Sequence, residues 1–256
     1  MIGDKLGKLV ILIIACLVCS STSAGRRPAE TGESSCEHAA SQTQSVAALQ
    51  EPVASYNAGK GRSISSKNRI VSLENPTIVI DVSKELQSFG VINFTLKKVA
   101  QVERYIFVRC DESGRAQRLF ITQFESVLPG LRGGYSFPMT NVTRIGNHDY
   151  ATQLGFFNFA ERIATNPGAE AEQTKAYLNR NGVQVDDDFA IARYARVVGE
   201  EKRHELIFFY LENLRNLNLT RSELEQDGSP SSETEQILAE LTARAKKSFK
   251  VVSDKN

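Results

Sequence analysis

The chain has 256 residues, of which 41% are hydrophobic and 24% are charged, and its formal net charge at pH 7 is +1. The first 24 residues contain two lysines and one aspartate, so without them the formal charge is 0 and no basic excess remains to neutralise phosphates. We therefore expect no nucleic-acid partner. Roughly 180 ordered residues are enough to bury the core of one domain without disulfide bonds.

The first 24 residues have the pattern of a secretory signal peptide. Lys5 and Lys8 give a weakly basic start, residues 9–18 are an apolar run, and small residues follow at 20–24. The run is too short to span a membrane alone, although an uncleaved anchor helix is the competing interpretation. Because Cys16 ends a segment that resembles a bacterial lipobox, we expect an exported protein that is secreted, periplasmic or membrane-anchored as a lipoprotein. A lipid anchor is then its only contact with a membrane.

Residues 25–68 are rich in Ser, Ala, Glu, Gln and Gly and show no sustained hydrophobic period. Such a segment buries too little apolar surface to offset its ordering entropy, which predicts a disordered spacer with at most short helical character at 42–50. We expect the globular domain at 69–215. Residues 216–256 are predicted to be a polar linker followed by a C-terminal helix.

The first half of the domain is predicted to consist of strands. Residues 77–82 are rich in β-branched side chains, and apolar and polar residues alternate at 89–99, so this second strand has one wet face. Residues 104–125 are predicted to form a hairpin whose halves are apolar on both faces, with Asp, Ser and Gly of a tight turn at 111–114. Strands with two apolar faces need cover on both sides, from helices or from a second sheet.

After a loop that runs to about residue 149, the pattern changes. Residues 151–164 are predicted to be a helix, although a strand at 153–159 competes because phenylalanines interrupt the helical spacing. Residues 169–181 form a clearer helix, with acids in the first turn and Gly182 in the capping position.

The next two segments, 189–198 and 203–214, are predicted to form a second apolar hairpin, with a helix as the rival structure for each half. A helix at 232–249 follows, which either docks weakly or stands free. The fold class predicted is therefore α+β: one antiparallel sheet of about six strands, built from the two hairpins, with two or more packed helices and disordered termini.

The tetrapeptide Gly-Asn-His-Asp at 146–149 resembles a motif of calcineurin-like metallophosphoesterases. That resemblance implies a metal ligand at Asn147 and an acid near the leaving group at His148. These enzymes also need an upstream Asp-x-His and further histidine ligands, whereas this sequence has three histidines and no Asp-x-His. We therefore do not assign the family, and we interpret the tetrapeptide as a polar turn.

The dipeptide His204-Glu205 resembles the start of a zincin helix, but Phe208 stands where the second histidine is required. We expect His204 to begin a strand and Glu205 to pair with a nearby arginine. The one remaining metal assembly would join His204 to His148 and Asp149 through folding, and our expectation is that there is no metal site and no cofactor.

Two other groups of residues carry possible chemistry. Glu125 and Glu212 lie near predicted strand ends, with Gln123 close by, and would form a carboxylate pair of the kind used in glycoside hydrolysis if folding brought them together. Cys36 and Cys110 are the cysteines that remain after signal cleavage, and we expect a disulfide bond between them in an oxidising compartment.

Two functional classes remain open. The first is a non-enzymatic binding or envelope-associated domain, whose aromatic-rich strands would bind an unidentified protein or an apolar ligand. The second is a hydrolase-like enzyme that uses His148, Asp149, His204 and Glu205 at strand ends. Because no complete catalytic constellation is present in the sequence, we prefer the first class, with no catalytic residue assigned.

Overall fold

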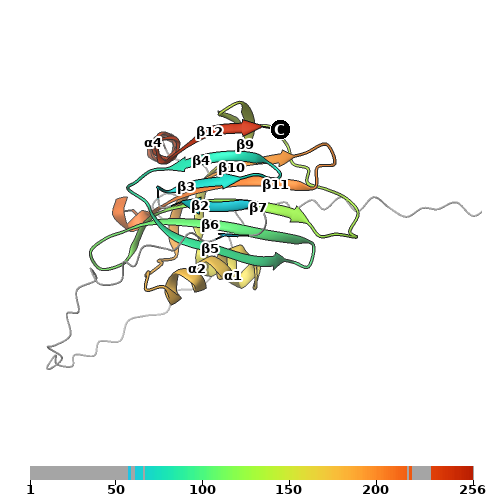
Figure 1. The fold of residues 1–256 in the computed structure, drawn as a ribbon. Coiled ribbons are helices and arrows are strands. Elements are labelled where there is room, and N and C mark those ends of the chain that lie inside the picture. The colour runs from blue at the N-terminus through green and yellow to red at the C-terminus, as the bar shows by residue number, and fades with distance from the viewer. Residues whose placement is uncertain (1–56, 59–60, 66, 218, 221–231, 256) are drawn as a thin grey trace, which may run out of the picture.

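The computed structural model describes residues 57–58, 61–65, 67–217, 219–220 and 232–255. They form an α+β fold with two antiparallel sheets, one of seven strands and one of five, and with helices outside the sheets (Figure 1). The prediction of a single sheet of about six strands is therefore wrong, although the α+β class and the antiparallel pairing are confirmed. In the described part of the chain, none of the helices is long and apolar enough to cross a membrane.

The larger sheet holds both predicted hairpins at its centre. Its strands, in spatial order, are β5 (Gln87–Leu96), β6 (Ala100–Cys110), β7 (Ala116–Val127), β11 (His204–Asn213), β10 (Asp188–Val198), β9 (His148–Asn158) and β8 (Val142–Ile145). The first hairpin is β6–β7, and its turn is closed by the Asp111 carboxylate, which accepts hydrogen bonds from the backbone N–H groups of Ser113 and Arg115. The second is β10–β11, and β7 pairs with β11 to join the two.

The smaller sheet is made from the two ends of the described chain. It contains β1 (Asn57–Ala58), β2 (Arg62–Ser65), β3 (Arg69–Ser72), β4 (Thr77–Val82) and β12 (Phe249–Lys255). β1 and β2 fall in the predicted spacer, and β12 falls in the predicted C-terminal segment, so the folded part extends beyond the expected limits 69–215. The composition did not indicate β2, because this strand has only four residues and one buried apolar side chain, Ile64.

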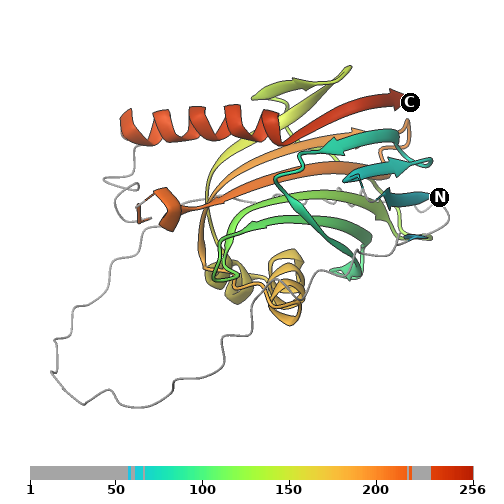
Figure 2. The same cartoon turned by 60° about the vertical axis from the view of Figure 1, so that its left-hand side comes forward.

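The larger sheet is covered on both faces, as its two-sided apolar strands predicted. Figure 2 shows the smaller sheet and α4 (Ser232–Ser248) on one face, and α1 (Phe159–Thr165) and α2 (Glu170–Arg180) on the other. Aromatic rings fill the layer between the sheets, where Phe249 stacks on Phe120 and lies tilted against Phe208, with ring centroids 4.8 and 4.7 Å apart. Leu178 of α2 is fully buried against the opposite face.

Residues 151–164 depart from the predicted helix. Most of this segment belongs to β9, which is paired in register with β10, and the short helix α1 begins only at Phe159. The Asn158 side chain fixes this boundary by accepting a hydrogen bond from the backbone N–H of Glu161 at 2.8 Å. The rival strand was therefore correct, since the alternating phenylalanines have apolar partners on both faces. β8 lies in what was predicted to be loop.

The C-terminal helix docks firmly. Leu241 and Ala245 of α4 are fully buried in the core between the layers, and β12 continues directly from the helix into the smaller sheet. The predicted helix at 169–181 is confirmed as α2, and Gly182 follows it with a φ of +79°. A short 3₁₀ helix, η2 (Leu214–Leu217), ends the last long strand.

Candidate functional site

The four residues proposed for a hydrolytic site lie on two strands that are not neighbours. His148 and Asp149 are on β9, His204 and Glu205 are on β11, and β10 lies between these strands. Asp149 forms an exposed ion pair with Arg144 across the β8–β9 hairpin, at 3.1 Å. In the described residues no group of three or more His, Cys, Asp or Glu side chains is placed to hold a metal ion.

His204 begins β11, as predicted, and its ring is held by two neutral partners. Its Nδ1 lies 2.8 Å from the Ser126 hydroxyl, and its Nε2 lies 3.3 Å from the Asn75 side-chain amide. Burial lowers the pKa of this imidazole, and the charges of Arg62 and Arg203 lower it further. Glu205 points to the opposite face of the sheet, as adjacent residues on a strand must.

The predicted cysteine sites can be placed only in part. Cys110 ends β6 and is half-buried, and burial raises the pKa of its thiol to about 11, with a further contribution from Asp111. Its proposed disulfide partner Cys36 and the proposed lipidation site Cys16 lie outside the described residues, so both expectations stay predictions.

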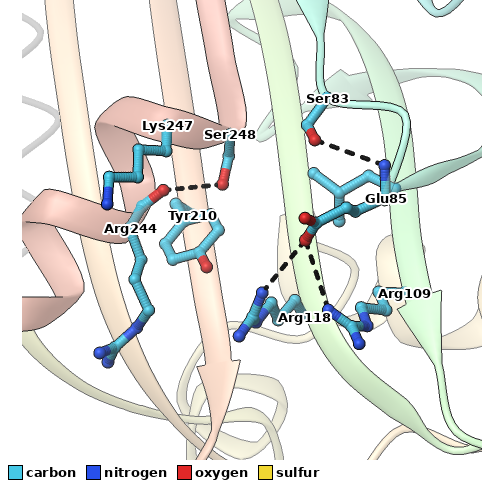
Figure 3. Close-up of a pocket in the computed structure, with 9 residues that line it drawn as sticks. Ser83, Glu85, Arg109, Arg118, Tyr210, Arg244, Lys247 and Ser248 are labelled. Atoms are coloured by element: carbon cyan, nitrogen blue, oxygen red, sulfur yellow. Dashed lines mark hydrogen bonds and ion pairs between the residues drawn. The ribbon is translucent and has the colours of Figure 1, made fainter.

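A small cleft with a cationic lining lies at one end of the layer between the sheets. It opens between the last turn of α4 and the turn at residues 83–86, above strands β6, β7 and β11 (Figure 3). Its volume is about 170 Å³. The lining residues are Ser83, Glu85, Leu86, Arg109, Arg118, Tyr210, Arg244, Lys247 and Ser248.

The register of the β6–β7 hairpin places two of the cationic side chains of the cleft next to each other. Arg109 and Arg118 are directly opposite each other on β6 and β7, an arrangement in which like charges repel. The Glu85 carboxylate lies 3.3 Å from the Arg109 guanidinium and 3.6 Å from that of Arg118, as Figure 3 shows. Lys247 faces the same cleft from α4 and has no ion-pair partner among the described residues.

The floor of the cleft ties α4 to the larger sheet. The Glu212 carboxylate is buried and accepts two hydrogen bonds from Nε of Arg244, while Nη2 of the same arginine lies 2.7 Å away. It also accepts a hydrogen bond from the Tyr210 hydroxyl and lies 3.4 Å from Nε of Arg118. Arg244 also pairs with Glu240 at 3.2 Å, so four cationic side chains face three carboxylates, Glu85, Glu212 and Glu240, which leaves one net positive charge at the cleft.

A second polar cluster is buried on the opposite face of the larger sheet, the face on which α1 and α2 pack, and it contacts α2. Glu125 on β7 and Glu205 on β11 are directly opposite each other in the ladder, and only 3% and 4% of their surfaces are exposed. Glu205 accepts a hydrogen bond from Arg193 at 3.0 Å, and Glu125 accepts one from the amide of Gln123. Arg104 continues the network from Gln123, at 2.5 Å, to the hydroxyl of a threonine on α2.

The carboxylate pair differs from the pair that the sequence suggested. Glu125 meets Glu205, whereas Glu212 lies seven positions further along the same ladder and on the other face. Both glutamates were singled out, but only the register of two distant hairpins brings them together. Tyr210 and Glu212 were singled out for other roles, but the cleft as a group was not predicted, and the one available signal was the pair of arginines flanking the turn at 111–115.

Comparisons of the chain with protein-family models, with curated proteins and with solved structures gave no match, so the function must be argued from this geometry.

Proposed function

We propose that this chain is the non-enzymatic binding domain of an exported protein, and that its cleft receives an acidic group of a protein partner. The observation that supports this most directly is the juxtaposition of Arg109 and Arg118 in the cleft, with Lys247 also in its lining. Guanidinium groups bind carboxylates through paired hydrogen bonds, and they keep their charge at any physiological pH.

The size of the cleft favours a group on a larger partner over a free ligand. A volume of about 170 Å³ is below the range of roughly 300–1,000 Å³ that is typical of small-molecule sites. It suits a single carboxylate presented by an acidic side chain. The aromatic residues that suggested an apolar ligand, Phe120, Phe124, Phe208 and Tyr210, are all buried in the core.

The hydrolase-like alternative has less support. It requires His148, Asp149, His204 and Glu205 in one cleft, and the intervening strand β10 together with the opposite facing of His204 and Glu205 speaks against such an assembly. We therefore retain the binding function as the proposal.

Fluorescence anisotropy with a dye-labelled oligo-glutamate peptide tests the proposal, and an oligo-glutamine peptide of equal length is the uncharged reference. Lys247→Gln removes a charge from the cleft, and Lys246→Gln removes the same charge from the same exposed helical turn outside it. We expect Lys247→Gln and Arg109→Gln to weaken binding about threefold to tenfold, in the range of one charge-assisted contact. Equal losses for Lys246→Gln and Lys247→Gln, or equal binding of the two peptides, would contradict the proposal.

A further inference from the structure

The buried Glu125–Glu205 pair places two acids where one charge is already difficult to accommodate. Directly opposite side chains in an antiparallel ladder have Cβ atoms only about 4.5–5.5 Å apart. Both side chains are almost fully buried, so water screens their repulsion very little. One oxygen of Glu125, Oε2, is buried without a hydrogen-bond partner among the described residues.

The surrounding charges balance the pair only if it holds one proton. Arg104 on β6 and Arg193 on β10 are the nearby cations, and Glu170 on α2 is a third acid that acts on both members of the pair. With one proton on the pair, two cations face two anions. Without that proton the cluster carries an extra buried negative charge.

The cover of this cluster is a loop, residues 128–141, that connects β7 to β8 and that we name the cover loop. Tyr135 is the one buried residue of this loop, 3% exposed, and its hydroxyl lies close to the Glu125 carboxyl group. Burial, followed by the charges of Glu125 and Glu205, raises the pKa of this hydroxyl, so it lies over the pair as a neutral group.

The two ends of the cover loop are fixed, because the Leu128 N–H donates to the carbonyl oxygen of Val99 at 2.9 Å and the Asn141 carbonyl oxygen accepts from the Thr152 N–H at 2.7 Å. The backbone N–H of Tyr135 donates to the carbonyl oxygen of Lys202 at 2.7 Å. The Arg203 guanidinium donates to the carbonyl oxygens of Leu131 and Leu128 at 2.8 and 3.1 Å. Arg203 is also the cation whose charge acts on the Tyr135 hydroxyl. Between the fixed ends, the tethers in the described chain lead to the β10–β11 turn, so residues 129–140 can swing away without breaking a strand ladder.

We propose that the cover loop closes over the Glu125–Glu205 pair while the pair holds a proton, and that it opens when the proton is lost. Hydration of the second carboxylate relieves the repulsion at the lowest cost in free energy. The cover loop is the most weakly held element over the pair, so it is the element that moves. Opening exposes the polar patch of the sheet that Glu125 and Glu205 form with Arg193.

The titration of the pair supports this inference. Burial, and then the charge of Glu205, raises the pKa of Glu125 to about 8. Burial raises that of Glu205 to about 7, against the opposing effect of Arg193. The proton therefore resides on Glu125, because Arg193 stabilises the ionised form of Glu205.

Hydrogen exchange of the folded protein tests the inference, with each rate divided by the intrinsic rate at that pH. Exposure returns the carboxyl group towards its ordinary pKa, so the open fraction of the cover loop should rise by up to about tenfold per pH unit between pH 6 and pH 8. The β6–β7 turn at residues 111–115 lies at the far end of the sheet and is the internal reference, which should not change.

Glu125→Gln mimics the protonated acid, so its cover loop should stay protected at both pH values. Glu112→Gln, the same substitution in an exposed turn, should behave like the unmodified protein. If Glu125→Gln does not fold, the unmodified protein alone still decides, because cover-loop protection that is constant from pH 6 to pH 8 overturns the inference. An equal loss of protection in β6 and β7 also overturns it, since that outcome means global unfolding.

Discussion

Two glutamates lie near the same arginine, one buried and one exposed, so the same Glu→Gln substitution at each shows how burial changes the contribution of an ion pair to stability. Glu212 and Glu85 both lie within 4 Å of Arg118, but their side chains are 5% and 66% exposed. Glu212→Gln removes the charge that faces Arg244 and Arg118 from beneath, and Glu85→Gln removes the charge that faces Arg118 and Arg109 from solvent.

The expected magnitudes differ because the two desolvation costs differ. Removing one partner of a fully buried ion pair costs about 3–5 kcal/mol, whereas an exposed pair contributes about 0–1 kcal/mol. Arg244 and Arg118 are about one-third exposed and regain part of their hydration. We therefore expect Glu212→Gln to lower the free energy of unfolding by about 2–3 kcal/mol, and Glu85→Gln by less than about 1 kcal/mol.

Urea unfolding at pH 7 measures both changes. With an m-value of about 2 kcal/mol/M, the midpoint should fall by about 1–1.5 M for Glu212→Gln and by less than about 0.5 M for Glu85→Gln. Equal midpoint shifts would refute the reasoning, because burial would then not determine the strength of these contacts. A changed m-value would show instead that α4 had detached in the folded state.

Two further predictions concern the other face of the sheet. Because the pKa values of Glu125 and Glu205 are raised in the folded protein, their stabilising contribution is complete below their ordinary pKa of 4.5 and is lost as the pH rises through about 7 and 8. Urea unfolding should therefore give a lower free energy at pH 8.5 than at pH 5, by an amount on the order of 3 kcal/mol that Glu125→Gln reduces, because burial still raises the pKa of Glu205 in that variant, and a stability that rises over this interval contradicts the assignment. At Gly134 an added Cβ would stand 2.5 Å from the Lys202 carbonyl oxygen, so Gly134→Ala should cost about 1–3 kcal/mol in the same assay. Gly155→Ala, where nothing lies within 4 Å, is the matched control, and an equal cost in both would show that this contact is not limiting.

Local signals in the sequence predicted the elements whose structure is determined locally. Alternating apolar residues and the Asp-x-Ser-Gly turn were sufficient for the β6–β7 hairpin, and the capping glycine was sufficient for α2. The pairing of β7 with β11 and the second sheet were not predictable in this way, because both depend on contacts between segments far apart in the chain.

The cleft and the buried carboxylate pair likewise depend on contacts between segments far apart in the chain. Cleft residues come from the β4–β5 turn, from β6, β7 and β11, and from α4, so no short motif contains them. The carboxylate pair requires a register between positions 125 and 205, and a shift by one residue would turn Glu205 to the other face. Sequence patterns can nominate such residues singly, but only the tertiary register groups them.

The position of β12 has a consequence for the order in which the chain can fold. Phe249 pairs with Val82 and packs its ring against Phe120 and Phe208, so β4 and the last strand of the described chain must meet before the layer between the sheets is complete. Contacts of such large sequence separation form slowly, because loop closure costs entropy before they are made. Until residues 249–255 have been synthesised, β4 has an unpaired edge and the aromatic layer is incomplete. The nascent chain therefore reaches its final packing only after this segment has been added, and the layer between the two sheets stays incomplete during most of the synthesis.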